Sequence, residues 1–305
     1  MKVSIIILTK NGQEYIGDCL REVTNQKFNE GFEIIVIDSG SSDRSLNIIN
    51  GYFVRLYNIK SGEFSHSKTR NFAVSLASGE YIVFLSQDAV PISNAWLSNL
   101  IEPFVSDKSI GASFGKQVTP AGIDPLNAFR LQWIYSDNPE IKDRSSESGF
   151  SRRTFSFSDV NSAVRKDLLT RFPFDEGLNF CEDTYLAKQL IVNGYKIAYC
   201  PDAAVYHGHN HSLLDVFRRY FDIAIAYRRI GILGKIKGIE GEGGKYAIEE
   251  LKYLGRHGYW LWIPIAFINN LVKYIGFKLG GMEGFLPLPV KKAISKYWFN
   301  HAKEI

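Results

Sequence analysis

Apolar runs alternate with amphipathic stretches along the N-terminal third of the chain. The runs are dense in Ile and Val and stand at Val3–Leu8, Phe32–Ile37, Tyr52–Leu56 and Tyr81–Leu85. Patterns of helical period separate them at Glu14–Thr24, Ser42–Ile49 and His66–Leu76. Strands without polar alternation are typically buried on both faces, so this order predicts a parallel βαβαβαβ sheet between two helix layers. Right-handed crossovers then bring Thr9, Asp38 and Asp88, near the carboxyl ends of their strands, to one edge.

The alternation of strand-like and helical patterns is less regular beyond residue 110. We expect further strands at Ile110–Val118, Phe157–Val164, Tyr195–Tyr199 and Ala203–Tyr206. A helix followed by a polar loop is expected over Pro120–Ser151, and a helix led by two acids over Glu182–Val192. Charge and pattern change near Ser212, after which we expect helices over Leu213–Arg229 and Tyr246–Arg256, separated by a Gly-rich turn.

The region from residue 212 to residue 305 differs in charge from the rest. It carries 15 Lys/Arg against 8 Asp/Glu, a net charge of +7, whereas residues 1–211 carry −3. No RNA- or DNA-reading motif accompanies these basic residues, so we favour an anionic membrane surface over nucleic acid as the partner.

One segment of this region, Tyr259–Leu279, is unusually apolar and aromatic, although Pro264 and Lys273 interrupt it. It is either a segment lying in the membrane interface, with Trp260, Trp262 and Tyr274 at headgroup depth, or a buried aromatic helix of a small C-terminal domain. Exposed aromatic side chains there could equally form a homodimer.

Composition restricts the class of protein and its compartment. With 305 residues, 45% of them hydrophobic and 22% charged, the chain can bury a full core, which excludes a disordered protein. Its three cysteines, Cys19, Cys181 and Cys200, lack metal-like spacing and are odd in number, which favours a reduced, cytoplasmic setting. The first residues read as a core strand rather than a signal peptide.

Two carboxylates follow buried strands. Asp88 ends the run Tyr81–Leu85 after Ser86-Gln87, where a carboxylate can hold a divalent ion against a diphosphate, so it is a candidate metal ligand. Asp38 leads into the small-residue turn Ser39–Asp43 and can accept the imide N–H of uracil or thymine, while the turn itself is explained by helix capping.

A cationic stretch opens the third expected helix. Arg70 suits a bidentate contact with a nucleotide diphosphate, and Lys68 reads equally well as a solvated surface charge. We therefore rank Arg70 above Lys68 as a phosphate ligand.

The pair Glu182-Asp183 begins a helix, where the macrodipole alone favours acids. The position of the pair in the chain also supports a catalytic role, because transfer of a sugar to a hydroxyl needs a carboxylate that takes the acceptor proton. We predict Asp183 as this base and Glu182 as the residue that orients the acceptor.

Three histidines occupy alternate positions in His207-Gly208-His209-Asn210-His211, just after a strand. Alternate residues of an extended segment share a face, so two of these imidazoles can reach one ion together with Asp88. Structural zinc is the weaker interpretation, because no cysteine lies nearby.

Taken together and in this order, these motifs resemble the inverting glycosyltransferases of family 2, and within them bacterial rhamnosyltransferases of cell-wall and O-antigen assembly. The similar stretches, within roughly residues 1–230, are Val3–Asn11, Ile37–Asp43, Phe64–Asn71, Phe84–Pro91, Asp159–Ala163, Cys181–Asp183 and Val205–His209. The resemblance implies an α/β fold of the GT-A type, a Rossmann-like nucleotide-diphospho-sugar transferase, with a helical C-terminal extension. The catalytic domain would span residues 1–211, with a nucleotide-sugar half over 1–118 and an acceptor half over 119–211.

The resemblance also implies roles for single residues. Thr9, Asn11, Asp38 and Gln87 would line the nucleotide-sugar site, and Arg70 would approach the phosphates. Asp88 would bind the metal, Mg²⁺ or Mn²⁺, with His207 or His209, and Asp183 would be the base. Further pocket residues, on the donor or the acceptor side, would be Ser156, Asp159 and Asn161.

The sequence departs from the common Asp-x-Asp pattern, since Ser86 replaces the first carboxylate. The Gln-Asp form is similar to that of rhamnosyltransferases, so we predict dTDP-rhamnose as donor and a lipid-linked saccharide at the inner face of the membrane as acceptor. The alternatives are a UDP-hexose or UDP-N-acetylhexosamine donor, or a nucleotide-sugar binding protein without turnover. Retention of Asp183 argues against the last.

Overall fold

A computed structural model describes residues 2–144, 153–178, 180–233 and 239–297. Its first part alternates strands with helices as expected. The strands are β1 (Val3–Thr9), β2 (Phe32–Asp38), β3 (Arg55–Asn58) and β4 (Tyr81–Ser86). The helices between them are α1 (Ile16–Thr24), α2 (Ser45–Ile49) and α3 (His66–Leu76), with the 3₁₀ turn η1 (Ser61–Glu63) before α3. All four strands are parallel, β1 pairing with both β2 and β4, so this prediction is confirmed.

The second part makes the sheet mixed rather than parallel. Its strands are β5 (Val90–Pro91), β6 (Ile110–Val118), β7 (Glu140–Lys142), β8 (Asn161–Arg165) and β9 (Lys196–Tyr206). Among the described residues the nine strands run in the order β3-β2-β1-β4-β8-β6-β9-β5, with β7 beside β9. Strand β8 is antiparallel to both β4 and β6, while β6 and β9 are parallel. An antiparallel β8 matters for the site, because its beginning meets the end of β4.

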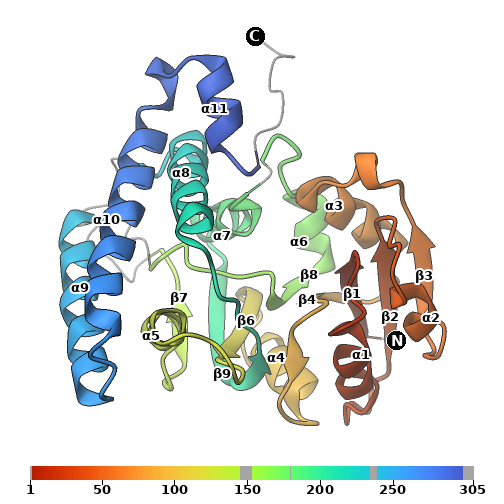
Figure 1. Ribbon diagram of the computed structural model, residues 1–305. Coiled ribbons are helices and arrows are strands. Elements are labelled where there is room, and N and C mark those ends of the chain that lie inside the picture. Colours follow the sequence, from red (N-terminus) through yellow and green to blue (C-terminus); the bar gives the residue numbers. More distant parts are fainter. Residues whose placement is uncertain (1, 145–152, 179, 234–238, 298–305) are drawn as a thin grey trace.

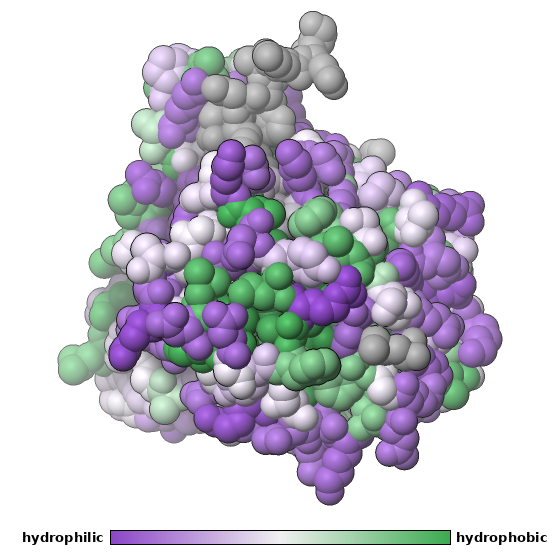
Figure 2. Space-filling view, turned by 90° about the vertical axis from the view of Figure 1, so that its right-hand side faces the viewer, coloured by the Kyte–Doolittle hydropathy of each residue, from purple (hydrophilic) through white to green (hydrophobic). Residues whose placement is uncertain are grey.

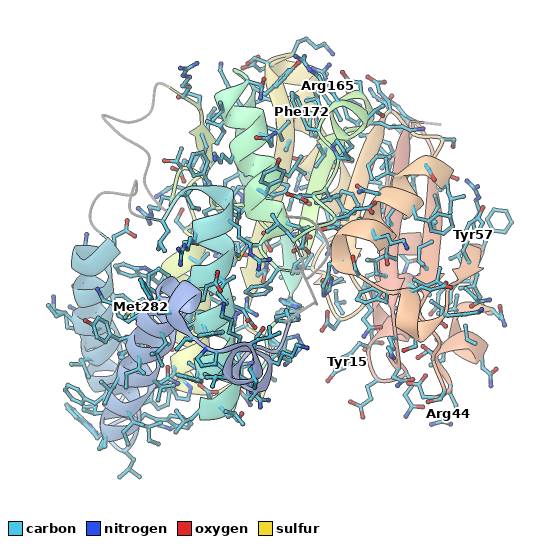
Figure 3. All side chains as sticks on the ribbon, turned by 90° about the horizontal axis from the view of Figure 1, so that it is seen from above. Tyr15, Arg44, Tyr57, Arg165, Phe172 and Met282 are labelled. Atoms are coloured by element: carbon cyan, nitrogen blue, oxygen red, sulfur yellow. The ribbon has the colours of Figure 1, made fainter. Side chains whose placement is uncertain are left out.

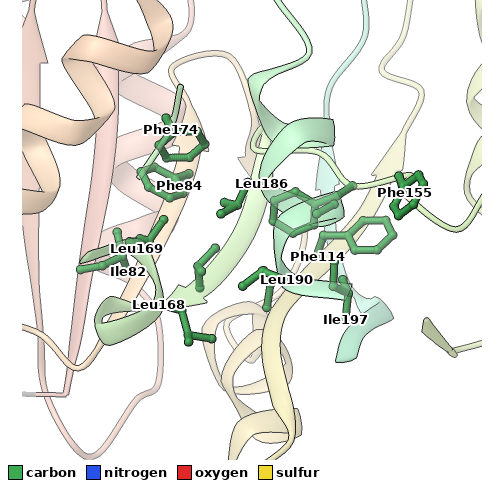
Figure 4. Packing of buried hydrophobic residues seen from close by; sticks show 14 of the residues in the cluster. Ile82, Phe84, Phe114, Phe155, Leu168, Leu169, Phe174, Leu186, Leu190 and Ile197 are labelled. Carbon is green, nitrogen blue, oxygen red and sulfur yellow. The ribbon is translucent and has the colours of Figure 1, made fainter. Parts of the chain in front are cut away.

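Helices cover both faces of the sheet (Figure 1). One core lies under α1 and α4 (Trp96–Ser106), where Trp96 and Leu100 are fully buried. The other lies under α3, α6 (Lys166–Arg171) and α7 (Glu182–Val192), and Figure 4 shows Phe84 beside Phe174 in this core. Burying each such side chain contributes roughly 1.5–3 kcal/mol, so two cores of this kind fix the sheet between its helices.

Several expected boundaries are wrong. Strand β3 begins at Arg55 rather than at Tyr52, and the strand expected from Phe157 begins at Asn161. The strands expected at Tyr195–Tyr199 and Ala203–Tyr206 form one continuous β9. Of the segment Pro120–Ser151, residues 145–151 lie outside the described residues, and the rest holds α5 (Pro125–Ile134) and β7. Helix α4 was not expected, because no cap or clear period marks it.

Among the described residues, four helices follow β9: α8 (Leu213–Ile230), α9 (Ile239–Arg256), α10 (Trp262–Gly281) and α11 (Leu288–Ile294), with the 3₁₀ turn η2 (Glu283–Phe285) before α11. Helices α8 and α10 cross closely, since a Cβ on Gly276 would stand 2.6 Å from the Phe217 carbonyl oxygen and one on Gly280 would stand 2.2 Å from that of Phe221. Seen from above, Met282 lies among these helices, while Arg44 and Tyr57 lie on the opposite side of the molecule (Figure 3).

The two interpretations of Tyr259–Leu279 can be compared with the exposure of α10. Ala266 and Asn269 are buried, but Phe267, Leu271 and Tyr274 are 62%, 58% and 57% exposed. The helix is therefore not a buried core helix along its whole circumference. No helix within the described ranges combines the length and apolar character needed to cross a membrane.

The side of the molecule with β2 and β3 also carries apolar surface. Figure 2 shows a hydrophobic patch there, surrounded by hydrophilic residues. Phe72 of α3 is 41% exposed, and its ring packs edge to face with that of Tyr57 on β3, at 6.5 Å between centroids. This patch lies away from α10, so the two apolar surfaces are separate.

Candidate functional site

An acid and two histidines come together beyond the ends of β4 and β9. His209 Nε2 lies 2.9 Å from Asp88 Oδ2, and His207 Nε2 lies 3.6 Å from Asp88 Oδ1. One ligand atom from each side chain falls within 4.8 Å of the others, and none of the three is fully buried. We call Asp88, His207 and His209 the metal-ligand group. The structure thus brings together the three residues that the sequence suggested as metal ligands.

The sheet positions this group. His207 follows β9 and donates its backbone N–H to the Val118 carbonyl oxygen at 3.0 Å, at the end of β6. Strand β5, two residues after Asp88, pairs with the end of β9, Val90 opposite Tyr206. A mixture of carboxylate oxygen and imidazole nitrogen suits Mn²⁺ and similar divalent ions, so the donor set fits a divalent cation.

Gln117 orients His207, a role that the sequence did not suggest. Its Oε1 lies 2.9 Å from His207 Nδ1, and since an amide oxygen only accepts, Nδ1 carries the proton. The lone pair of Nε2 is then free for a cation. Burial lowers the pKa of His207 to about 4, despite the opposing charge of Asp88, so the ring is neutral near pH 7.

The ionised state of Asp88 is favoured as well. Burial works against it, but the hydrogen bond from His209 and the proximity of both histidines lower the pKa of this carboxyl overall. A carboxylate and a neutral imidazole are the protonation states in which these side chains bind metals.

Two residues assigned to the nucleotide site join β1 to β4. Thr9 Oγ1 donates to Gln87 Oε1 at 2.6 Å, and the Lys10 backbone N–H donates to the same oxygen at 3.1 Å. A Cβ on Gly12 would stand 2.4 Å from Gln87 Oε1, so the glycine allows this close approach. Thr9 and Gln87 therefore satisfy each other, and Asp88 is the residue of the Ser86-Gln87-Asp88 stretch that faces the histidines.

Asn11 and Asp38 fix the loops after β1 and β2. Asn11 has a positive φ of 46°, and its Oδ1 accepts from the Ser42 backbone N–H at 2.9 Å. Asp38 is buried and accepts from the backbone N–H groups of Gly40 and Ser41 at 2.9 and 3.0 Å. Capping thus explains the Asp38 side chain as well as the turn, which differs from our expectation that its carboxylate is free for a base.

Arg70 lies in a buried ion cluster. Its guanidinium contacts Asp159 Oδ2 at 2.8 Å and Glu182 Oε1 at 2.6 Å, and its side chain is 9% exposed. Arg70 and Glu182 thus pair with each other, and this arrangement does not favour the expected contacts of Arg70 with phosphates and of Glu182 with the acceptor, which stay predictions. We call Arg70, Asp159 and Glu182 the buried ion cluster.

Asp183 stands at the edge of this cluster. It is partly exposed, and its Oδ1 accepts from the Thr184 backbone N–H at 2.6 Å. Burial and the negative charges of Asp159 and Glu182 raise the pKa of Asp183 well above its usual range. A carboxyl with a raised pKa is a stronger proton acceptor once it is ionised, as a general base requires.

The residue before this pair has an unusual backbone. Cys181 is in the left-handed region, with φ 60° and ψ 26°, and no side-chain hydrogen bond caps the helix that follows. Left-handed conformations of residues other than glycine and asparagine cost on the order of 1 kcal/mol or more, and they gather at functional sites.

The metal-ligand group and the buried ion cluster lie at one edge of the sheet. The Ser86 backbone N–H donates to the Val160 carbonyl oxygen at 3.0 Å, so the end of β4 meets the segment that carries Asp159. Gln117 Nε2 donates to Ser158 Oγ at 3.0 Å, which joins His207 to the same segment. The antiparallel direction of β8, which the sequence did not predict, creates this junction.

The remaining pocket candidates differ from one another. Asn161 is fully buried; its Oδ1 accepts from Trp96 Nε1 at 2.8 Å and its Nδ2 donates to the Ala203 carbonyl oxygen at 2.7 Å. It therefore holds the sheet together from a fully buried position, and its predicted place in a pocket stays a prediction. Ser156 is partly exposed, and its carbonyl oxygen accepts from Lys142 Nζ at 2.6 Å.

Sequence comparison identifies relatives along nearly the whole chain. The protein is 31% identical to the O-antigen chain rhamnosyltransferase RfbN of Salmonella typhimurium, over 98% of this chain and 97% of that protein. It is also 31% identical to the O-antigen chain rhamnosyltransferase WbaN of Salmonella anatum, over 89% of this chain and 88% of that protein.

Structural comparison and family matching agree with these relatives. The mannosyltransferase PcManGT of Pyrobaculum calidifontis, solved with GDP-Man and Mn²⁺, superposes with a TM-score of 0.60 at 16% identity, over 96% of this chain and 78% of that one. TarS 1-349 of S. aureus, solved with UDP, gives 0.53 at 19% identity, over 93% and 91%. These likenesses show the GT-A fold, as the sequence predicted. Residues 4–169 match Glycosyl transferase family 2, and with the relatives above this match shows that the chain is a glycosyltransferase belonging to family 2.

Proposed function

We propose that this glycosyltransferase moves L-rhamnose from dTDP-rhamnose, with inversion, onto a hydroxyl of a growing lipid-linked cell-surface polysaccharide. The observation that carries the proposal is the similarity, over nearly the whole chain, to two proteins named O-antigen chain rhamnosyltransferases. The solved structures named above are less similar in sequence and support the fold alone.

Asp183 is the base in this proposal. The oxygen of the acceptor hydroxyl forms a bond to the anomeric carbon, and the bond from that carbon to the diphosphate oxygen breaks. Asp183 takes the hydroxyl proton as the oxygen attacks from the face opposite the leaving group, which inverts the configuration. Its partial exposure and its place at the helix start favour this role over the buried Glu182.

The metal-ligand group serves the departing diphosphate. Asp88, His207 and His209 would hold Mg²⁺ or Mn²⁺, and the bound ion would neutralise the charge that develops on the leaving group. Gln87 accepts a hydrogen bond from Thr9 and carries no carboxylate. Asp88 is therefore the one carboxylate of the Ser86-Gln87-Asp88 stretch, and the histidines complete the ligand set. Manganese, the softer of the two ions, suits two imidazoles better than magnesium does.

The loops after β1 and β2 form the nucleotide side. Asn11 ties them together through Ser42, and Asp38 fixes the turn whose backbone a base would approach. In this arrangement Asp38 recognises the base through the shape of the turn rather than through a free carboxylate.

A panel of purified nucleotide sugars, titrated by calorimetry with and without Mn²⁺, tests the donor. We expect dTDP-rhamnose to bind most tightly, and Asp88→Ala to lose the Mn²⁺-dependent part of the affinity. Preference for a UDP-hexose or UDP-N-acetylhexosamine would reject the rhamnose assignment and leave the fold and the base untouched. Absence of binding by every donor would reject the nucleotide-sugar site itself.

We further propose that the enzyme docks on the inner face of the cell membrane through α10. The exposed residues of this helix and its flanks are mainly apolar or aromatic and include Trp260, Leu261, Phe267, Leu271, Tyr274 and Phe285. The surrounding region carries a net charge of +7, which complements anionic headgroups. A lipid-linked acceptor would be reached from such a surface.

Vesicle co-sedimentation tests the docking proposal. Replacing Phe267 and Leu271 by Ser should lower binding to anionic vesicles at least about tenfold, because an apolar contribution is lost from each side chain. A matched control replaces Phe53 and Val105, which are 101% and 56% exposed on other parts of the molecule, and should bind as the wild type does. Unchanged sedimentation of the first variant would reject docking, and dissociation of a homodimer by the same change would favour the dimer.

A further inference from the structure

The segment after α11 returns to α8 and is anchored there. Asp222 of α8 accepts from Ser295 Oγ at 2.5 Å and from the backbone N–H groups of Lys296 and Tyr297 at 3.0 and 3.3 Å. The Asp222 side chain is buried, so these three bonds satisfy a carboxylate removed from water. We call Ser295, Lys296 and Tyr297 the C-terminal strap.

The strap ends against an aromatic residue beside the candidate base. The rings of Tyr297 and Phe180 stack at 4.8 Å between centroids with 7° between their planes. The guanidinium carbon of Arg219, on α8, lies 5.1 Å from the centre of the same Phe180 ring. Phe180 is thus held from α8 twice, directly by Arg219 and through the strap by Tyr297.

Phe180 precedes the left-handed Cys181, and Asp183 follows two residues later. A ring that is fixed in place restricts the backbone of the next residue, which is the one in the costly conformation. Helix α7 has no side-chain cap at its start, so contacts of the preceding segment define how the helix begins.

The strap also reaches the helix that carries Arg70. The Tyr297 ring lies 6.5 Å from that of His66, the first residue of α3. Helices α3 and α7 are joined by the ion pair between Arg70 and Glu182. Tyr297 therefore lies beside the first residue of α3 and stacks on Phe180 just before α7, the two helices that carry Arg70 and Glu182.

We infer that the C-terminal strap positions the base: Tyr297, stacked on Phe180, holds the turn at Cys181 so that Asp183 faces the acceptor hydroxyl. Tyr297 is a positioning residue that acts through Phe180. The inference rests on the proposed role of Asp183, and it gives the C-terminal region a part in the chemistry in addition to docking.

The Tyr297 ring, rather than its hydroxyl, carries the effect, since the stack on Phe180 uses the ring alone. In the full chain, Tyr297→Ala should lower kcat about tenfold and leave the donor dissociation constant within about twofold, because the hydrogen bonds and ring contacts of the strap described above are with α8, Phe180 and His66. Tyr297→Phe should retain the activity of the wild type. Phe53→Ala removes a fully exposed ring and serves as the control.

The pH profile of kcat separates positioning from simple structural support. A displaced turn changes the surroundings of Asp183, so Tyr297→Ala should move the acid limb of the profile, and Phe180→Leu should move it similarly. The double variant should lose no more than the larger single loss, because both changes break one contact.

Three outcomes decide the inference independently of the proposed function. A Tyr297→Ala enzyme with unchanged kcat and acid limb overturns it, while the Asp183→Asn variant still tests the base. Equal loss of donor binding and activity also overturns it, since that marks general loss of structure. If Tyr297→Ala does not fold, Tyr297→Leu replaces it, with the same expectation of a lowered kcat and a moved acid limb, and wild-type values in both overturn the inference.

Discussion

The metal-ligand group and the buried ion cluster lie at the same edge of the sheet but differ in construction. Asp88, His207 and His209 each offer one ligand atom within 4.8 Å of the others, and none of the three is fully buried. Arg70, in contrast, is enclosed with Asp159 and Glu182, which supply the counter-charge that a buried guanidinium needs. The metal-ligand group is accessible to a ligand that exchanges. The charges of the buried ion cluster are instead neutralised within the cluster.

This difference separates binding from positioning. A group that binds a diphosphate through a cation has to stay accessible, whereas a group that holds two helices together can be closed. Asp183 lies between these cases, because it adjoins the closed cluster and is itself partly exposed. The comparison therefore predicts different effects for substitutions in each place.

The largest effect is expected at Asp183. Asp183→Asn should lower kcat by at least about a thousandfold, since the amide cannot take the acceptor proton, while donor binding remains nearly unchanged. In the wild type, kcat should rise with pH through the raised pKa of this carboxyl, because only the ionised form accepts a proton. Steady-state kinetics across pH, with donor calorimetry on the variant, measure both.

Asp167→Asn is a suitable control, because Asp167 pairs with Arg165 on the exposed surface at the other end of β8. Its kcat should match that of the wild type. Transfer at a normal rate by Asp183→Asn would show that another group takes the proton. The comparison of the two clusters would then say nothing about catalysis.

The sequence predicted the first four strands and their helices because these elements are local and periodic. Strand β1 is apolar from Ile5 to Leu8, and α3 begins with a Ser65 cap whose side chain accepts from the Lys68 backbone N–H. Strand β8 was expected too early in the sequence, and its direction was not predicted. Its orientation depends on pairing with β4 and β6, which no local pattern encodes.

The residues of the site also divide into those that a local pattern predicts and those that depend on distant contacts. Asp88, His207 and His209 were found because motif spacing places them after strands that end at one edge. The ion pairs of Arg70 were not, because Glu182 is 112 residues away in sequence and the same arginine suits phosphates equally well. Gln117 was missed because it carries no charge and belongs to no motif, although its place at the end of β6, opposite β9, was a usable signal.

A second test addresses the closed cluster. Arg70→Gln should lower the free energy of unfolding by about 3–5 kcal/mol, because Asp159 and Glu182 would remain buried without their cation. Urea denaturation measures this loss. Arg21→Gln is the control, since Arg21 and its partner Asp18 are 55% and 58% exposed, and such surface pairs contribute about 1 kcal/mol or less. Equal stability of the two variants would mean that the cluster is not closed in solution.

The smallest effect is expected in the open group, at a residue that orients a ligand without binding the ion. Gln117→Leu removes the acceptor that keeps the proton on His207 Nδ1, so the ring can take the tautomer that blocks Nε2. The Mn²⁺ concentration for half-maximal activity should rise about tenfold, while kcat at saturating Mn²⁺ stays within about threefold. Gln132→Leu, on the exposed surface of α5, should change neither value. An unchanged Mn²⁺ requirement in Gln117→Leu would mean that His207 is held by the backbone of β9 alone. Loss of kcat at saturating Mn²⁺ would instead mean that Gln117 takes part in the chemical step, and the distinction between the two clusters would not hold.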